Sequence, residues 1–415
     1  MIDFETFTLE NGLRVIVHED PKVEIAILNV LYDVGSRDED PGLTGFAHLF
    51  EHLMFGGSQN IPSYDEALQK AGGENNAFTS PDITNYYMTL PAQNLETGFW
   101  LESDRMLGLS FDPKVLEVQR NVVIEEFKQR YLNQPYGDVW LKLRPLAYQT
   151  HPYQWPTIGK NISHVEKATM DQVKSFFYTH YIPNNATLVV AGNVKTEQVK
   201  EYSEKWFGPI PAGEKQKRKL PAEPEQVERR ELSVTANVPL DALYMTFHMT
   251  GKFDTHYYSE DLLSDILGRD KSSRLYNRLV RDEEMFHSVN ASITGSIDPG
   301  LLVISGKLNP GIDILKAEKG VLRVIDELVE HGPTEAELEK VKNQAEASKV
   351  FSEIEPLNKA INLAIASLSG HIGLVNDEVE KIRSTTLEDI TNSAQKVLKT
   401  GNSSVLYYRA KQASS

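Results

Sequence analysis

His48-Leu-Phe-Glu-His52 places two histidines four residues apart, with a glutamate directly before the second. If residues 44–55 form a helix that Thr44 caps, both imidazoles project from one face, one turn apart. Two imidazoles at this spacing can share one zinc ion. Glu51 then lies beside the metal, where its carboxylate can take a proton from water that the metal acidifies. The order H-x-x-E-H therefore predicts metal-assisted hydrolysis. An amphipathic helix with two surface histidines is the simpler alternative.

A third metal ligand is expected, because a catalytic zinc usually has three protein ligands and one open position. The chain contains no cysteine, so this ligand must be a histidine or an acid. Residues 113–131 show helical spacing and offer Glu125 and Glu126. The apolar positions of this segment include Val115, Val118, Val122 and Phe127. Spacing alone does not choose between the two acids, and for either one a solvated helix face is the ordinary alternative.

A repeat predicts two copies of one domain. Residues 26–35 have the pattern of a strand ending in glycine, and residues 242–251 have the same pattern 216 positions later. Near the end of each copy, helix starts at 169–173 and 386–390 each lead to a strand, with an offset of 217. A nearly constant offset over so long a span favours a repeat, and chance similarity between helix starts is the alternative.

A linker separates the two copies. Residues 212–230 are charged, contain proline and almost lack large apolar side chains, as expected for an exposed linker. We therefore predict a catalytic N-terminal domain at 1–211 and a homologous C-terminal domain without a zinc motif at 231–415. The length of 415 residues agrees with this division, because it exceeds what one ordinary core supports.

Each copy mixes strands with helices. Residues 7–17 predict a hairpin that turns at Asn11-Gly12, and Tyr86–Leu90 reads as a strand that Pro91 ends. Helical spacing follows these strands along the chain. We predict an α+β fold of two homologous domains, each a mostly antiparallel sheet packed with helices.

Composition is that of a globular protein, with 40% apolar and 25% charged residues and no apolar run long enough for a membrane span. The first residues, Met1–Phe7, lack the basic and apolar regions of a signal peptide. The chain is therefore expected to be cytoplasmic as written, and periplasmic if a leader was removed. The formal net charge of −16 argues against nucleic-acid partners. It weakly favours cationic peptides, although solubility alone explains it.

At these motifs the chain resembles a known family. His48–Ser58, followed by Arg120–Glu126, is similar to the motifs of the pitrilysin/insulinase family of inverzincin metallopeptidases, which includes the mitochondrial processing peptidase. The resemblance covers nearly the whole chain, because the two-copy layout is also the family's. It implies one zinc ion per chain, with Glu51 as the general base and with the metal ligands His48, His52 and Glu126.

A second match concerns substrate binding. Gly72–Ser80 is similar to the family's active-site edge strand, on which a peptide adds as an extra β-strand through main-chain hydrogen bonds. The resemblance implies that Asn76, Ala77 and Phe78 contact the substrate. Without the family, the same stretch reads as a turn followed by a buried strand.

A third match lies in the second copy, which has no H-x-x-E-H motif. Residues 272–289 resemble a family region in which an arginine and a downstream tyrosine bind substrate and stabilise the oxyanion. Arg281 aligns with the arginine, but His287 stands near the position of the tyrosine. His287 can still donate a hydrogen bond to an oxyanion. Alternatively, a partner subunit supplies a functional arginine–tyrosine pair, and we favour this interpretation.

Together these features predict a zinc-dependent endopeptidase that cleaves peptides or unfolded segments. The resemblance also implies a homodimer, or a heterodimer with a related family subunit, because the family pairs such chains into a chamber of four domains. A non-catalytic structural or scaffolding subunit of the same family is the main alternative, and a metal-binding protein without hydrolytic activity is another. Glu51 favours the enzyme, since simple zinc binding needs no carboxylate at that position.

Overall fold

The computed structural model of the chain describes residues 1–215 and 217–411. Internal contacts divide the chain into two compact units, each assembled from three stretches of sequence. Unit 1 contains Met1–Lys128, Trp155–Pro221 and Val350–Asp377, and unit 2 contains Gln129–Gln154, Ala222–Lys349 and the chain from Glu378 onward. The predicted limits of 1–211 and 231–415 refer to copies of the sequence rather than to these units, and they stay a prediction.

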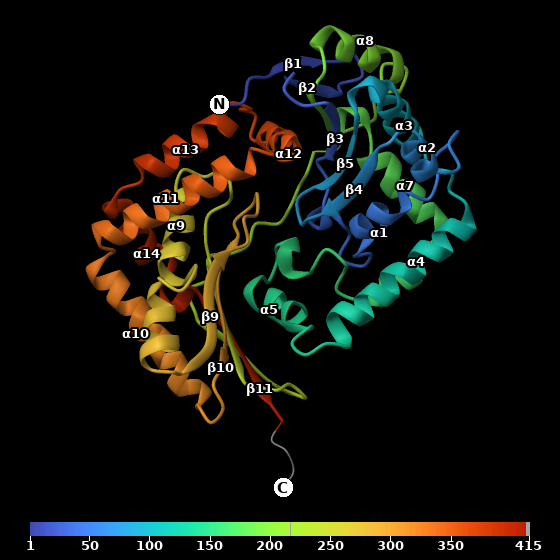
Figure 1. Cartoon of the computed structure of the whole chain (residues 1–415). Coiled ribbons are helices and arrows are strands. Elements are labelled where there is room, and N and C mark those ends of the chain that lie inside the picture. The colour runs from blue at the N-terminus through green and yellow to red at the C-terminus, as the bar shows by residue number, and fades with distance from the viewer. Residues whose placement is uncertain (216, 412–415) are drawn as a thin grey trace. The chain divides into compact units, whose positions relative to one another are not determined.

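Unit 1 is built on a six-stranded sheet (Figure 1). The strand order is β1-β2-β6-β3-β5-β4, and among these neighbours only β2 and β6 run parallel. The predicted hairpin at its start is present, with Gly12 at a φ of 86° in the turn, a conformation that favours glycine. The strands are β1 (Glu5–Thr8), β2 (Arg14–Glu19), β3 (Ile25–Tyr32), β4 (Glu74–Thr79), β5 (Thr84–Pro91) and β6 (Ala186–Gly192).

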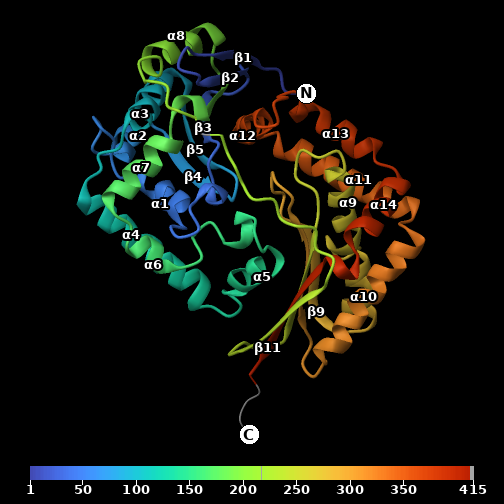
Figure 2. The ribbon, with the colours of Figure 1, turned by 180° about the vertical axis from the view of Figure 1, so that it is seen from behind.

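Unit 2 repeats this plan with five strands (Figure 2). Their order is β7-β11-β8-β10-β9, with β7 and β11 parallel and the other neighbours antiparallel. This order and sense match β2-β6-β3-β5-β4 of unit 1, strand for strand. The strands are β7 (Arg230–Ala236), β8 (Ala242–His248), β9 (Phe286–Ile293), β10 (Leu301–Leu308) and β11 (Ser403–Ala410).

The two sheets also share a register. Asn29 of β3 lies opposite Val189 of β6, and Met245 of β8 lies opposite Val405 of β11. Both partners are displaced by 216 positions (245 − 29 and 405 − 189), which is the offset of the sequence repeat. The predicted architecture of two mostly antiparallel sheets packed with helices is confirmed.

Helices flank both sheets, and the two predicted helix starts are confirmed. α7 begins at a capping box of Thr169 and Gln172, and α14 begins at one of Thr386 and Asp389. None of the helices within the described residues is both long and apolar enough to cross a bilayer. The helices that concern the site and the sheets are α1 (Phe46–Leu53), α3 (Leu95–Leu107), α4 (Pro113–Phe127), α5 (Val139–Ala147), α6 (Ile162–Glu166), α7 (Met170–His180), α8 (Thr196–Trp206), α9 (Tyr257–Gly268), α10 (Ile314–His331), α11 (Glu335–Ser352), α12 (Pro356–Ser367), α13 (Leu374–Ser384) and α14 (Leu387–Val397), besides the short α2 (Tyr64–Lys70).

The cores lie between the sheets and their helices. Every residue of β6 is buried, as expected for a strand that is covered on both faces. In unit 2, one apolar cluster joins β8, β9 and β10 to α9, α10 and α14. These packed layers give each unit a rigid base.

Each unit contains one helix that the sequence repeat would assign to the other copy. α12 packs on β6, β3 and β2 of unit 1, and α5 packs on β11, β7 and β8 of unit 2 (Figure 1). Two arginines, 216 positions apart, cap the C-terminal ends of these helices. Arg14 donates to the carbonyl of Ser367 at 2.7 Å, and Arg230 donates to the carbonyl of Ala147 at 2.6 Å. A cation is favourable at a helix C-terminus, because the last carbonyls lack partners within the helix.

Candidate metal centre

The histidine helix α1 spans Phe46–Leu53 and is shorter at both ends than the predicted 44–55. Thr44 does not cap it, contrary to the prediction. Gly45 is the N-cap residue, at a φ of 93° in the left-handed region that favours glycine. The hydroxyl of Thr44 instead lies 2.9 Å from Nδ1 of His164. The helix therefore begins only after the chain has turned at Gly45.

Glu39 takes the place of the predicted cap. Its carboxylate accepts hydrogen bonds from the N–H groups of Gly45 at 3.0 Å and Ala47 at 2.9 Å, and from the indole N–H of Trp155 at 3.2 Å. Glu39 is 5% exposed, and this burial raises the pKa of Glu39 to about 8, against the opposing effect of the same hydrogen bonds. Glu39 has no capping signal in the sequence, because the usual signal lies within three residues of the helix start.

His48 and His52 of α1 face Glu126 of α4. The Nε2 atom of each histidine lies 3.5 Å from the same carboxylate oxygen of Glu126, and the two ring centroids are 5.0 Å apart. One ligand atom from each of the three residues falls within 4.8 Å of the other two. Their side chains are 9%, 24% and 30% exposed, so the cluster is shielded yet can be reached from solvent.

The neighbouring acid, Glu125, points elsewhere. Its side chain is 60% exposed and pairs with Lys128 at 2.7 Å. α4 continues to Phe127, and the last predicted turn is a π-helical segment, Lys128–Leu132. The structure thus brings Glu126, and not Glu125, to the two histidines.

The apolar face of α4 differs from the predicted one. Phe127 is buried, but Val118 and Val122 are 57% and 44% exposed. Residues four apart share a helix face, so these two valines lie in the row of Glu126 rather than in the core. The buried residues of the helix are Leu116, Val123, Ile124 and Phe127.

A buried aromatic cluster contacts α1 on the core side of the helix. The hydroxyl of Tyr86 donates to the carbonyl of Phe50 at 3.1 Å, and burial raises the pKa of Tyr86 well above its usual range, so that this hydroxyl keeps its proton. The guanidinium of Arg105 lies 4.5 Å from the Tyr86 ring centroid and pairs with Glu102 at 2.7 Å. Arg105 is 1% exposed, a rare position for arginine that the sequence pattern does not reveal.

The predicted substrate strand is an edge strand. Asn76, Ala77 and Phe78 lie in β4, which pairs with β5 and has no second neighbour among the described strands. Asn76 is exposed, and the other two residues are half-buried. β4 also contacts α1 within unit 1. A strand with an open edge can accept an added peptide strand.

The two predicted oxyanion residues lie in unit 2. Arg281 belongs to the π-helical segment Tyr276–Asp282, and its side chain is 63% exposed and pairs with Asp282 at 2.9 Å. His287 is exposed on β9, an edge strand of the second sheet. Their roles at the metal site stay predictions.

The three donors fit a zinc ion. Zinc binds imidazole nitrogen and carboxylate oxygen at about 2.0–2.2 Å in tetrahedral sites, which places two ligand atoms about 3.4 Å apart. The distances of 3.5 Å from each Nε2 to the Glu126 oxygen match this value. Three protein ligands leave a fourth position for a reactant, as in catalytic sites. The fold and the site thus define a class: a two-unit α+β protein with a candidate catalytic zinc centre.

Comparisons with known proteins narrow this class to a family. A family model described as Insulinase (Peptidase family M16) matches residues 14–160, and a model described as Peptidase M16 inactive domain matches residues 167–345. The chain is 31% identical to Zinc protease PqqE of Helicobacter pylori over 348 residues, which cover 81% of this chain and 77% of that relative. The chain belongs to the insulinase family of peptidases, M16.

Solved structures agree with this assignment. The crystal structure of a protease from Helicobacter pylori matches with a TM-score of 0.92 and 26% identity, over 99% of this chain and 100% of that one. The periplasmic protease PqqL of Escherichia coli matches with a TM-score of 0.80 and 19% identity, over 98% of this chain but only 48% of that one. The second likeness shows that the fold also occurs within a chain about twice as long.

Proposed function

We propose that this chain is a zinc-dependent endopeptidase that cleaves peptides or unfolded segments. One observation carries the proposal: His48, His52 and Glu126 converge, with both Nε2 atoms 3.5 Å from one carboxylate oxygen. Glu51, whose carboxylate is placed to act as a general base, lies on the same helix between the two histidines. Its presence favours hydrolysis over metal storage or scaffolding.

The proposed roles follow from the helix positions. His48, His52 and Glu126 would hold one zinc ion. When bound, this ion would act as a Lewis acid that polarises a carbonyl and lowers the pKa of water towards about 7. Glu51, three residues after His48, projects from the same face of α1. It takes a proton from the attacking water and returns it to the leaving amine.

Substrate binding is proposed at the edge of β4. Asn76, Ala77 and Phe78 would pair with the peptide backbone, which is common to all sequences, so recognition depends little on substrate side chains. An extended segment is needed for this pairing, which favours peptides and unfolded segments over folded domains. Arg281 and His287, or the corresponding residues of a partner subunit, would bind the substrate carbonyl and stabilise the oxyanion.

Metal removal tests the proposal. Dialysis against a chelator should abolish cleavage of an unfolded model peptide, and one equivalent of zinc per chain should restore it. A His48→Ala variant treated in the same way provides the control, because zinc should not restore its activity. Cleavage that persists in metal-free protein would contradict the proposal, and zinc binding without any cleavage would favour the scaffolding role.

A further inference from the structure

We propose that Glu39, held in place by the linker residue Arg218, is the positioning residue that sets the histidine helix for metal binding. The inference rests on the proposed metal site, and it assigns a function to two residues outside the ligand set. Both residues belong to unit 1, as does α1.

The contacts of Glu39 are concentrated on the first turn of α1. One carboxylate oxygen accepts the N–H of Gly45, and the other accepts the N–H of Ala47, which directly precedes His48. Trp155, 1% exposed, donates its indole N–H to Glu39 at 3.2 Å and to the carbonyl of Ser36 at 2.9 Å. Glu39 thus joins the start of α1 to the preceding turn and to a buried indole.

A short helix depends strongly on such a contact. α1 has eight residues, so its first turn is a large part of its length, and the amides of that turn lack partners within the helix. The two oxygens of the Glu39 side chain satisfy two of these amides. Because His48 and His52 share one zinc ion only at a defined separation, a frayed first turn would displace His48 relative to His52 and Glu126.

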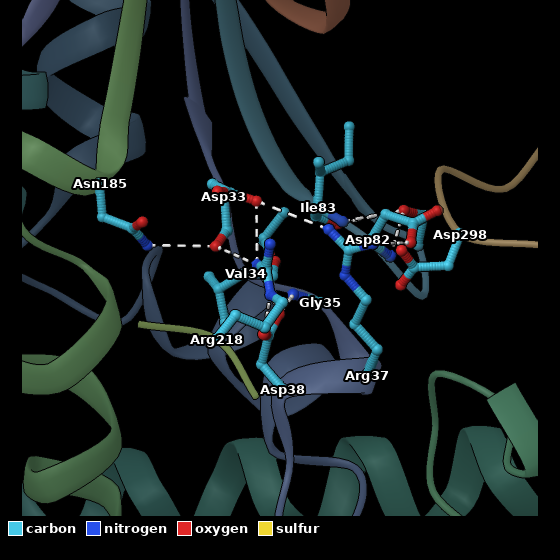
Figure 3. Close-up of polar contacts among 12 residues, drawn as sticks. Asp33, Val34, Gly35, Arg37, Asp38, Asp82, Ile83, Asn185, Arg218 and Asp298 are labelled. Carbon is cyan, nitrogen blue, oxygen red and sulfur yellow. Dashed lines mark hydrogen bonds and ion pairs between the residues drawn. The ribbon is translucent and has the colours of Figure 1, made fainter. Parts of the chain in front are cut away.

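Arg218 holds the turn that directly precedes Glu39; Figure 3 shows Arg218 beside Asp33 and Asp38 of this segment. Its Nε donates to Asp38 at 2.6 Å, and its Nη2 donates to the carboxylate of Asp33 at 2.9 Å. Asp38 in turn accepts the N–H of Gly35 at 3.0 Å, which closes the turn 35–38 directly before Glu39. Arg218 lies in the segment predicted as an exposed linker, yet only 29% of its side-chain surface is exposed.

The second sequence copy provides an internal comparison. Gly35 approaches the carbonyl of Pro81 so closely that an added Cβ would lie 2.3 Å from its oxygen, and a Cβ added at Gly251 would lie 2.2 Å from the carbonyl oxygen of Ile297. Both pairs are offset by 216 positions, so the two turns correspond. The position that corresponds to Glu39 is Thr255. A glutamate at this sequence position is therefore present in the copy that carries the histidine pair and replaced by threonine in the copy that lacks it.

Two readouts on Glu39→Gln test the inference. Zinc affinity is measured by competition with a chelator, and hydrogen exchange of the α1 amides is measured in metal-free protein. Glutamine has the shape of glutamate but turns an N–H donor towards one of the two helix amides. We expect zinc to bind about tenfold or more weakly, as for other supporting residues of metal sites. We expect the α1 amides to exchange about tenfold faster, as for a lost helix cap.

Arg218→Gln is the second variant, and it should change both readouts in the same direction but by less. Lys219→Gln is its matched control, because it removes an exposed positive charge from the same segment. Glu260→Gln is the control for Glu39→Gln. Glu260 is a buried carboxylate of α9 that accepts the N–H of Thr250 at 2.8 Å, so its loss should lower the thermal midpoint and leave zinc affinity unchanged.

The outcomes separate this inference from the proposed function. Parent-like zinc affinity and α1 exchange in both Glu39→Gln and Arg218→Gln would overturn the inference, as would equal losses in Glu260→Gln. If Glu39→Gln does not fold, Arg218→Gln decides by the same two readouts. A parent protein that binds zinc without cleaving peptides contradicts the proposed function alone, and the exchange measurement in metal-free protein still tests the role of Glu39.

Discussion

Adjacent glutamates in α4 have opposite environments, and this difference supports Glu126 as the proposed third ligand. Glu126 lies 3.5 Å from both histidines, whereas Glu125 pairs with Lys128 on the exposed face. Helix geometry turns neighbouring side chains about 100° apart, so both cannot face α1. Spacing in the sequence leaves the choice between Glu125 and Glu126 open, and the fold favours Glu126.

Substitution of these two residues separates their roles. Glu126→Gln should weaken zinc binding by at least about tenfold, because one charged ligand is lost, and cleavage should fall with it. Glu125→Gln is the matched control and should retain parent zinc content and activity, since it loses only a surface ion pair worth about 0–1 kcal/mol. Metal analysis after gel filtration checks both. Zinc loss in Glu125→Gln alone would show that the wrong acid has been assigned.

The residues of the site differ in how far the sequence reveals them. His48, Glu51 and His52 are found from spacing, because residues within one helical turn share a face. Glu126 enters through the family resemblance and lies 74 positions after His52, beyond the reach of periodicity. Glu39 gives no local signal, since it caps α1 from a separate turn. Its detection needs the tertiary structure, or the comparison of the two sequence copies.

At the scale of elements, the exchange of α5 and α12 is the main departure from a simple duplication. α12 covers β6, β3 and β2, and its residues Ala360, Leu363 and Ala364 are fully buried. The likeness of the two sheets in strand order and register, and the two capping boxes, agree with the repeat that the sequence shows. The exchange could not be predicted, because periodicity identifies the apolar face of a helix but not the sheet that the face covers.

This exchange predicts that the first sequence copy does not fold alone. A chain of residues 1–211 lacks α12 and should aggregate or remain poorly structured, because the sheet face under α12 is left exposed to water. A matched chain that joins residues 1–211 to 350–377 through a flexible linker restores the helix and should be more soluble. Circular dichroism and thermal unfolding compare the two. Cooperative unfolding of 1–211 on its own would contradict the role given to α12.

At the scale of the whole molecule, the chain matches just under half of the longer Escherichia coli protease. The predicted assembly with another copy of this chain or with a related subunit rests on the family resemblance. Arg281 and His287 bear on this choice, because a histidine stands near the position at which the resemblance implies a tyrosine. A partner with a complete pair would compensate for this change.

Light scattering of the purified chain tests this expectation. We predict a mass of twice the chain mass, or, if the partner is a different subunit, slow peptide cleavage by the chain alone that rises when that subunit is added. A homodimer with fast cleavage would show that His287 suffices and that no second type of subunit is needed. A monomer with full activity would contradict the predicted assembly altogether.

Three residues are proposed to hold zinc, and a fourth, Glu51, is proposed to transfer the proton. Glu51→Gln tests this proposal most directly, because the substitution keeps the size of the side chain and leaves all three proposed ligands in place. Zinc content and cleavage of an unfolded peptide are measured on the same preparation, with the parent chain as control. We expect the variant to bind one zinc per chain, as the parent does, with cleavage reduced by about 10² or more. Cleavage at the parent rate, or loss of zinc from the variant, would contradict the proposal.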